Sequence, residues 1–174
     1  MSKPRISFEK RVQQAARAFW RARLSAVENQ RSRGRQDQGN RAAVTGGKTM
    51  DSFREMLTDL VRQNAPRGTE VHRDKSMVVL PGFFRPTKSW DLLLTHQGRL
   101  LAALELKSLC GPSFGNNANN RCEEALGSGF DFRKAQSEGL FGAGASPFLG
   151  YFILVEDAPG SQSSVAAKSP HFPT

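Results

Sequence analysis

Two carboxylates and a lysine are spaced so that one β-hairpin would bring them together. Asp91 opens a short apolar run, and Glu105-Leu106-Lys107 closes the next one. The intervening residues 95–99 have the composition of a turn between antiparallel strands. Because strand side chains alternate between faces, Glu105 and Lys107 would share one face, with Leu106 on the packed side. The hairpin is therefore expected to bring Asp91 close to the face that carries Glu105 and Lys107.

These residue types together suit metal-dependent hydrolysis of a phosphodiester. A hard cation such as Mg²⁺ prefers oxygen ligands and usually takes one or two carboxylates together with water and substrate phosphate. Asp91 and Glu105 are the predicted metal ligands, with the main-chain carbonyl of Leu106 as a third. Lys107 is predicted to lie beside the scissile phosphate, where it orients or helps to deprotonate the attacking water.

A simpler interpretation of the same residues remains open at this point. Glu-x-Lys triplets on solvent-facing strands usually form exposed ion pairs of little energetic value, and an Asp before three leucines can simply start a strand. The flanking runs 92–94 and 100–104 consist only of Leu and Ala, which indicates a hairpin in a domain core. Charged groups at the ends of core strands require an explanation, and this favours the catalytic interpretation.

The positive charge is concentrated at the N-terminus. Residues 1–48 hold 12 Lys and Arg against three Asp and Glu, whereas residues 49–174 hold 13 of each sign, so the net charge of +9 lies in the first segment. A basic segment beside a neutral domain favours a polyanionic partner such as DNA. The alternatives are a solvated helix and a helix on a membrane surface. Neither a transmembrane run nor a signal peptide is expected, and Cys110 and Cys122 form no metal or disulfide pattern, which fits a reducing cytoplasm.

Periodicity predicts a basic helix followed by a polar arm. Over residues 5–29 the apolar side chains recur at helical spacing and most of the Lys and Arg residues lie elsewhere around the axis. The apolar stripe comprises Phe8, Val12, Ala15, Phe19, Trp20, Leu24 and Val27. Residues 29–47 are polar and Gly-rich, and their Arg31, Arg33 and Arg35 could contact DNA phosphates or enter a groove. An arm without any function is the alternative.

Residues 46–49, Gly-Gly-Lys-Thr, resemble the end of a phosphate-binding loop, but Ala42 replaces its first glycine, so nucleotide binding is rejected.

The remaining elements predict an α/β fold. A second helix is expected over 50–64, where Glu55 and Asp59 share the polar face; they are ordinary surface residues, or one of them reaches the metal site. An extended segment at 77–80, the hairpin, a loop at 111–117, a crossover helix at 119–139 and a buried strand at 148–155 follow. The predicted order of helix, strand, hairpin, crossover helix and strand gives a mixed sheet flanked by helices.

Several longer stretches resemble the XhoI family of type II restriction endonucleases, within the PD-(D/E)xK superfamily. They lie at residues 37–39, 44–47, 80–86, 90–93, 101–108, 111–117, 119–128 and 149–157. The Gly-Pro-Ser-Phe-Gly-Asn-Asn stretch at 111–117 is far more specific than the Glu-x-Lys triplet. The resemblance covers most of the chain and implies a restriction-endonuclease-like core preceded by the basic N-terminal helix.

The resemblance also implies an activity and its partners. It implies Mg²⁺-dependent cleavage of double-stranded DNA at a short palindrome, typically CTCGAG, leaving 5′-phosphates, with Asp91, Glu105 and Lys107 as the catalytic residues. A symmetric site implies a homodimer, and a cognate DNA methyltransferase is expected in the same system without direct contact. The set predicted to contact DNA just past the catalytic strand comprises Ser113, Asn116, Asn117, Asn119, Asn120 and Arg121. Asn and Arg can read adenine and guanine edges, although each of these residues could instead cap a helix or satisfy a loop.

The expected organisation has three parts: a basic helix and arm at 1–48, a nuclease core at 49–157 and a polar tail at 158–174. Family members are longer, and the abrupt Pro-, Ser- and Ala-rich end predicts a C-terminally truncated chain. Two rival functions remain open. One is a repair-type nuclease on the same core, and the other is a DNA-binding remnant without catalysis.

Overall fold

A computed structural model describes residues 6–32, 50–164 and 171 of the chain. The helices are α1 (Phe8–Ser32), α3 (Asp51–Asn64), α4 (Phe114–Ser137) and α5 (Pro159–Gln162). The strands are β1 (Thr69–His72), β2 (Val79–Pro81), β3 (Thr87–Ser89), β4 (Leu92–His96), β5 (Arg99–Leu109) and β6 (Phe148–Val155). No helix within these ranges is long and apolar enough to span a bilayer. The architecture is mixed α/β, as the sequence predicts.

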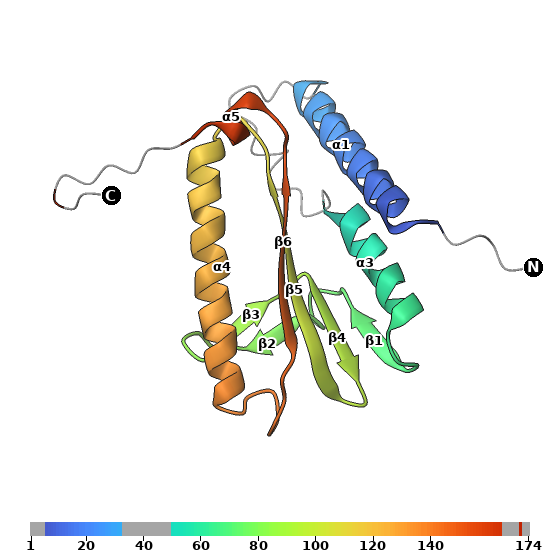
Figure 1. Cartoon of the computed structure of the whole chain (residues 1–174), viewed down its shortest axis with the longest axis vertical. Coiled ribbons are helices and arrows are strands. Elements are labelled where there is room, and N and C mark those ends of the chain that lie inside the picture. The colour runs from blue at the N-terminus through green and yellow to red at the C-terminus, as the bar shows by residue number, and fades with distance from the viewer. Residues whose placement is uncertain (1–5, 33–49, 165–170, 172–174) are drawn as a thin grey trace, which may run out of the picture.

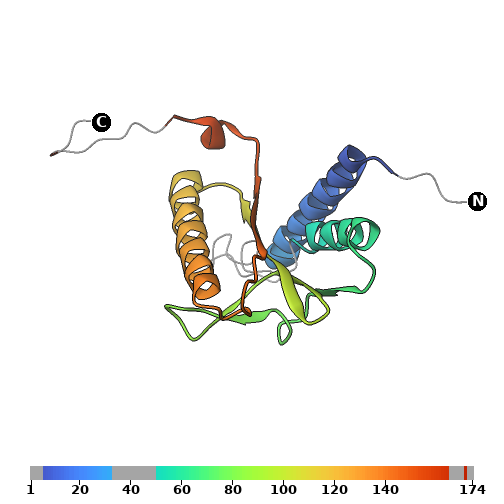
Figure 2. The same ribbon diagram turned by 60° about the horizontal axis from the view of Figure 1, so that its bottom comes forward.

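A mixed four-stranded sheet forms the centre of the molecule (Figure 1). Its strand order is β1-β4-β5-β6, with antiparallel pairing up to β5 and parallel pairing between β5 and β6. The parallel pair requires a crossover, which α4 supplies. Helices α1 and α3 lie on one side of the sheet and α4 lies on the other (Figure 2). The predicted crossover helix and mixed sheet are therefore confirmed.

The predicted hairpin is the β4–β5 pair. Leu92 pairs with Leu104 and Leu93 with Ala103, so one further step along this register sets Asp91 opposite Glu105. The turn has two residues with positive φ, Gln97 at 50° and Gly98 at 73°. Such left-handed pairs match the twist of a two-residue hairpin. The turn starts the hairpin, and a register shift of one residue between Leu94 and Thr95 then gives the pairing that brings the two acidic positions together.

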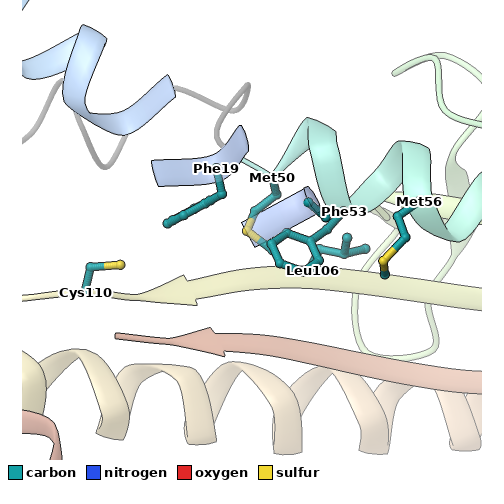
Figure 3. Close-up of a cluster of buried hydrophobic side chains, with 7 residues drawn as sticks. Phe19, Met50, Phe53, Met56, Leu106 and Cys110 are labelled. Atoms are coloured by element: carbon teal, nitrogen blue, oxygen red, sulfur yellow. The ribbon is translucent and has the colours of Figure 1, made fainter. Parts of the chain in front are cut away.

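Two cores lie on the two faces of the sheet. On the α3 side, Leu106 packs among side chains of α1 and α3, and Figure 3 shows it directed from β5 towards Phe53. Phe19 and Phe53 are almost fully buried, at 0% and 1% exposure. On the α4 side, Trp90 and Phe132 pack edge to face with their ring centroids 5.5 Å apart. Because α1 contributes to the first core, the basic helix packs on the same sheet as the predicted site.

Several local predictions are wrong. The strand predicted at 77–80 does not pair with the hairpin, since β2 pairs with β3 in a separate two-stranded sheet. The strand beside β4 is β1, a segment whose only aliphatic residue, Val71, gives no apolar pattern. Strand β6, predicted to be buried, lies at the sheet edge and is half exposed. Phe8 and Leu24 of the α1 stripe are exposed rather than packed.

Helix α4 begins earlier than predicted. The sequence predicts a loop at 111–117, because Gly and Asn are poor helix formers, whereas the helix starts at Phe114. The Phe114 ring lies so close to Gly111 and Gly160 that a Cβ at either glycine would approach within 2.9 Å or 2.8 Å. Tertiary packing around this ring therefore overrides the weak local helix propensity.

Candidate active site

Glu105 and Lys107 share one face of β5, as predicted. Glu105 is 5% exposed, and its Oε1 forms an ion pair with the Lys107 ammonium at 2.5 Å. The other oxygen, Oε2, accepts a hydrogen bond from Lys88 of β3 at 3.1 Å. A carboxylate this deeply buried keeps its charge only when it is paired. Glu105 therefore has one ammonium group on each oxygen.

Asp91 lies next to this face but makes its contacts at the strand edge. Its Oδ2 accepts the main-chain N–H of Leu106 at 2.8 Å, and its Oδ1 lies 3.3 Å from the guanidinium of Arg54 on α3. Arg54 also contacts Asp51 at 3.0 Å. The hairpin thus brings Asp91 beside the peptide that joins Glu105 to Lys107.

Between the sheet and α4 lies an open pocket of about 470 Å³. The residues lining it are Arg85, Lys88, Glu105, Lys107, Glu123, Glu124, Gly127, Ser128 and Tyr151. Asp91 is not one of them, so its carboxylate approaches the Glu105 peptide from outside the pocket lining. Charged side chains of both signs line this pocket, which suits a polar substrate rather than an apolar one.

Beside Glu105 lies a hydrogen-bonded wall of Arg121, Glu124 and Tyr151, in which Tyr151 is the β6 partner of Glu105 in the sheet. Arg121 pairs with Glu124 at 2.5 Å, and the Tyr151 hydroxyl donates to the same carboxylate at 3.2 Å. Although burial acts to raise it, the pKa of Glu124 is lowered by the hydrogen bond and charge of Arg121, with Lys107 and Tyr151 contributing. Burial, and then the Glu124 charge, raise the pKa of Tyr151 far above its ordinary range. Glu124 is thus held as an anion and Tyr151 as a neutral donor.

The β2–β3 hairpin delivers Lys88 to the pocket. Asp131 of α4, 3% exposed, accepts the main-chain N–H groups of Phe83 and Phe84 at 3.0 and 2.7 Å and pairs with Arg85 at 3.3 Å. These bonds fasten the turn between β2 and β3 to α4. Lys88 then lies over the Trp90 ring, 4.6 Å from its centroid.

The oxygen groups at this place fit a hard divalent cation. Asp91 and Glu105 supply carboxylates, and the Leu106 carbonyl points to the same strand edge as the Leu106 N–H that Asp91 accepts. Oxygen ligands of this kind suit Mg²⁺, which keeps several waters and needs few protein groups. No cluster of three or more His, Cys, Asp or Glu side chains suitable for a metal occurs among the described residues. The fit therefore depends on two carboxylates and one carbonyl.

The residues predicted to contact DNA are distributed differently from the expectation. Ser113 is the N-cap residue of α4 without a side-chain capping bond, and the four Asn residues and Arg121 lie in its first turns instead of a loop. Asn119 bonds Glu123 at 2.8 Å. Of the predicted arm, Arg31 lies in the last turn of α1, whereas Arg33, Arg35 and the residues at 46–49 fall outside the described ranges. DNA contact by any of them stays a prediction.

The two acids of α3 belong to a different surface. Glu55 and Asp59 line a pocket between α1 and α3 together with Arg11 and Gln63. The α3 residue that reaches Asp91 is their neighbour Arg54. Cys110 is buried and free, and burial raises the pKa of its thiol, while Cys122 is free and exposed.

Sequence reasoning missed four groups at the site: Arg54, Lys88, Glu124 and Tyr151. Arg54 and Lys88 come from segments 37 and 17 residues away from the carboxylates that they contact. A weak signal exists for Lys88, the single charged residue between Pro86 and Trp90. Glu124 and Tyr151 lie 27 residues apart and meet only because α4 crosses from β5 to β6.

Comparison with known proteins identifies relatives over most of the chain. A family profile described as "Restriction endonuclease XhoI" matches residues 29–174. The type II restriction enzyme AbrI of Azospirillum brasilense is 46% identical over 95% of this chain and 74% of its own length. The enzymes XhoI of Xanthomonas vasicola and BstVI of Geobacillus stearothermophilus are 48% and 49% identical over 89% and 78% of this chain, each match covering 62% of the relative. No solved structure matches the chain significantly.

Proposed function

The chain belongs to the XhoI family of type II restriction endonucleases, and we propose that it hydrolyses double-stranded DNA at the site formed by Asp91, Glu105 and Lys107. We propose that this site stands on a restriction-endonuclease core. Apart from the β2–β3 hairpin, inserted between β1 and β4, its order is a helix (α3), three antiparallel strands (β1, β4, β5), a crossover helix (α4) and a parallel strand (β6). The matched segment spans 62% of two of the relatives, so the activity of this chain is itself part of the proposal.

One observation carries the proposal: a buried, charged Glu105 contacts Lys107 at an open pocket, beside the Asp91 carboxylate. A solvent-exposed ion pair would leave Glu105 in water, whereas its 5% exposure makes its charge costly unless the charge is paired. Glu124 and Tyr151, whose pKa values are shifted, line the same pocket, and such groups in a cleft are typical of functional sites. The geometry therefore favours the catalytic interpretation over the exposed ion pair.

Asp91, Glu105 and the Leu106 carbonyl are the groups that would hold Mg²⁺. The bound metal would supply Lewis acidity for the phosphoryl group and a water of lowered pKa. Asp91 is held ready by the Leu106 N–H, and Glu105 by its lysine partners, so neither acid needs to be reoriented when DNA binds. Because the acids are positioned before the reaction, arranging them adds little to the activation free energy of the chemical step.

Lys107 has the second role. Its side chain is 29% exposed, so its ammonium group contacts Glu105 and still reaches the pocket. We assign it to the scissile phosphate, where it orients the attacking water and stabilises the charge that develops on the phosphoryl oxygens. The neutral Tyr151 hydroxyl and the Arg121–Glu124 pair form the adjoining wall, where the polar backbone of one DNA strand would pass.

Recognition of CTCGAG by a homodimer, with 5′-phosphate products, completes the proposal. A palindrome is read symmetrically by a two-fold dimer with one active site for each strand. The Asn side chains in the first turns of α4 and Arg121 are the proposed base- and phosphate-contacting groups. A cognate methyltransferase would protect the host DNA without touching this protein.

Plasmid cleavage tests the proposal. Purified chain is incubated with plasmid DNA with and without Mg²⁺, beside a Lys107→Ala variant and a control, Lys75→Ala, at an exposed residue outside the basic helix and the pocket. The expected result is a set of discrete Mg²⁺-dependent fragments whose ends map to CTCGAG, absent only with Lys107→Ala. Random fragments would favour a repair-type nuclease. Salt-sensitive DNA binding that Glu105→Ala leaves unchanged, without cleavage, would identify a non-catalytic DNA-binding remnant.

A further inference from the structure

A second lysine, Lys88, pairs with Glu105, the carboxylate that is proposed to bind metal. Lys88 Nζ lies 3.1 Å from Glu105 Oε2, while Lys107 Nζ lies 2.5 Å from Oε1. The Lys88 side chain is 14% exposed, half as much as that of Lys107, at 29%. Lys88 is therefore the more deeply held of the two cations on this carboxylate.

The fold holds Lys88 in this place through contacts that lie outside the site. Its ammonium lies over the Trp90 ring, and its strand is fastened to α4 through Asp131. Lys88 also pairs with Leu80 in the β2–β3 ladder. A lysine held in this way loses less conformational freedom on forming an ion pair than an exposed one does.

The charges around Glu105 do not balance. Arg54 on Asp91 is also paired with Asp51, whereas the single carboxylate of Glu105 carries both Lys88 and Lys107. A divalent cation that binds Glu105 would therefore meet one positive charge more than this carboxylate neutralises. A phosphate of a DNA strand brings one negative charge and offers oxygens that a lysine ammonium binds readily.

We propose that Lys88 is a second active-site lysine that moves from Glu105 to a DNA phosphate. In the free protein it neutralises Glu105 and opposes metal binding. When DNA enters the pocket, its ammonium transfers to a phosphate oxygen and Oε2 of Glu105 becomes available, so metal binds tightly only together with DNA. The inference rests on the proposed function, because it takes Glu105 as a metal ligand.

The alternative is a purely structural ion pair, in which Lys88 compensates the buried Glu105 and never leaves it. The two cases differ in the metal affinity of the free protein. Removing a structural partner leaves metal binding unchanged or weaker, since the site loosens. Removing a competing cation strengthens metal binding, because Coulomb repulsion over a few ångströms in a site of reduced dielectric is large.

Direct Mn²⁺ binding without DNA, followed by electron paramagnetic resonance, is the first test. Lys88→Met keeps the apolar stem over Trp90 and removes the charge. The matched control is Lys134→Met, because Lys134 also pairs with a carboxylate, Glu138, and lies 5.0 Å from the centroid of the Phe83 ring, but does not line the pocket. We expect Lys88→Met to bind Mn²⁺ about tenfold more tightly or better, with wild-type affinity in Lys134→Met and Lys88→Arg.

The salt dependence of DNA binding in the absence of metal is the second test. The logarithm of the DNA association constant falls linearly with the logarithm of the salt concentration. Loss of one phosphate contact makes this slope shallower by about 0.9. Lys88→Met is expected to show this decrease, while Lys88→Arg and Lys134→Met keep the wild-type slope. Far-ultraviolet circular dichroism and thermal unfolding confirm that each variant is folded before either measurement.

The inference is overturned if Lys88→Met binds Mn²⁺ no more tightly than the wild type, or if the gain survives in Lys88→Met combined with Glu105→Gln. An unchanged salt slope in Lys88→Met also overturns it. These outcomes are separate from failure of the proposed function. If the chain never cleaves DNA but Lys88→Met gains Glu105-dependent Mn²⁺ affinity, the nuclease activity is refuted and the role of Lys88 is supported. If the chain cleaves DNA but Lys88→Met gains no Mn²⁺ affinity, the nuclease activity is supported and the role of Lys88 is refuted.

Discussion

The carboxylate of Asp91 replaces a strand partner of Leu106: its Oδ2 accepts the Leu106 N–H at 2.8 Å, one residue before β4 begins. The preceding ladder bond runs from the Asp91 N–H to the Leu104 carbonyl at 3.0 Å. In an antiparallel ladder the N–H and C=O of one residue point to the same side, so the Leu106 carbonyl also faces this edge. One side chain therefore completes the sheet and brings two oxygen groups together.

Asp91→Asn and Asp91→Ala should separate these two roles. Asn retains an amide oxygen for the Leu106 N–H, so Asp91→Asn should keep most of the stability and lose Mg²⁺-dependent cleavage. Ala leaves that N–H without an acceptor and leaves Arg54 paired with Asp51 alone, at a cost of about 1–3 kcal/mol. Urea unfolding measures the stability, and plasmid cleavage measures the activity.

Asp51→Ala is the matched control for this pair of variants. It removes the other carboxylate on Arg54, in a partly exposed i,i+3 pair, without touching β5. Its stability should change by less than about 0.5 kcal/mol, with cleavage retained. If Asp91→Asn cleaved DNA as the wild type does, Asp91 would have only its structural role.

The bonds from Asp131 to Phe83, Phe84 and Arg85, here called the Asp131 anchor, are expected to control the position of Lys88. Asp131→Ala leaves two main-chain N–H groups and Arg85 without their acceptor, which should destabilise the chain by about 2–4 kcal/mol. It should also free the turn between β2 and β3. Chemical denaturation gives the stability, and hydrogen exchange at Phe83 and Phe84 gives the local opening.

Gly82→Ala tests the same anchor from the backbone side. A Cβ at Gly82 would lie 2.7 Å from the Arg85 carbonyl and 2.7 Å from Asp131 Oδ2, so the turn must shift. Gly98→Ala is a contrasting change, since no atom lies near its Cβ, although its φ of +73° adds strain. Only Gly82→Ala should increase exchange at Phe83 and Phe84. Equal exchange in both variants would argue against the anchor.

The hairpin could be predicted from the sequence because its signals are local. Two apolar runs flank the turn at Gln97–Gly98, and alternation places Glu105 and Lys107 on one face of β5, although the register shift between Leu94 and Thr95 has no sequence signal. The crossover helix follows in the same way from the order of apolar segments. The types of the three long helices, the hairpin strands and β6, and the identity of the three proposed catalytic residues, therefore rest on local patterns, whereas β1 has none.

The partners of these residues could not be predicted, because no local pattern specifies them. Arg54 reaches Asp91 only after α3 packs across the sheet, and Lys88 reaches Glu105 only after Asp131 fastens a hairpin to α4. The start of α4 was missed for a related reason, since the Phe114 ring packs against Gly111 and Gly160. Long-range packing decides each of these features.

The core beneath the site should be sensitive to loss of Phe53. This residue is 1% exposed, and its ring lies 6.5 Å from that of Phe19 and 5.1 Å from that of Phe152, measured between centroids. Phe53→Ala should cost about 3–5 kcal/mol, because a cavity forms beneath β5. Equilibrium unfolding in urea measures the loss. Phe130→Ala, at a residue 67% exposed, is the control and should cost far less.

Tyr151 offers a direct measurement of the pocket's electrostatics, because it is the single tyrosine of the chain. Burial and the Glu124 carboxylate raise the pKa of its hydroxyl well above the ordinary value of about 10. The folded protein should therefore form no tyrosinate at pH 10, where an unfolded chain is half ionised. Because the folded state holds this proton more tightly, stability should decrease as the pH rises above about 10.

Spectrophotometric titration of tyrosinate absorbance, in native buffer and in urea, measures both pKa values of Tyr151. Glu124→Gln removes the negative charge and keeps an amide at the same position, so it should lower the native pKa of Tyr151, while burial still holds it above the unfolded value. Glu123→Gln is the matched control, because Glu123 bonds Asn119 and not Tyr151. Equal titration curves for Glu124→Gln and the wild type would show that burial alone sets the pKa. The proposed DNA-facing wall would then lack the charge coupling between Tyr151 and Glu124 that the hydrogen bond indicates.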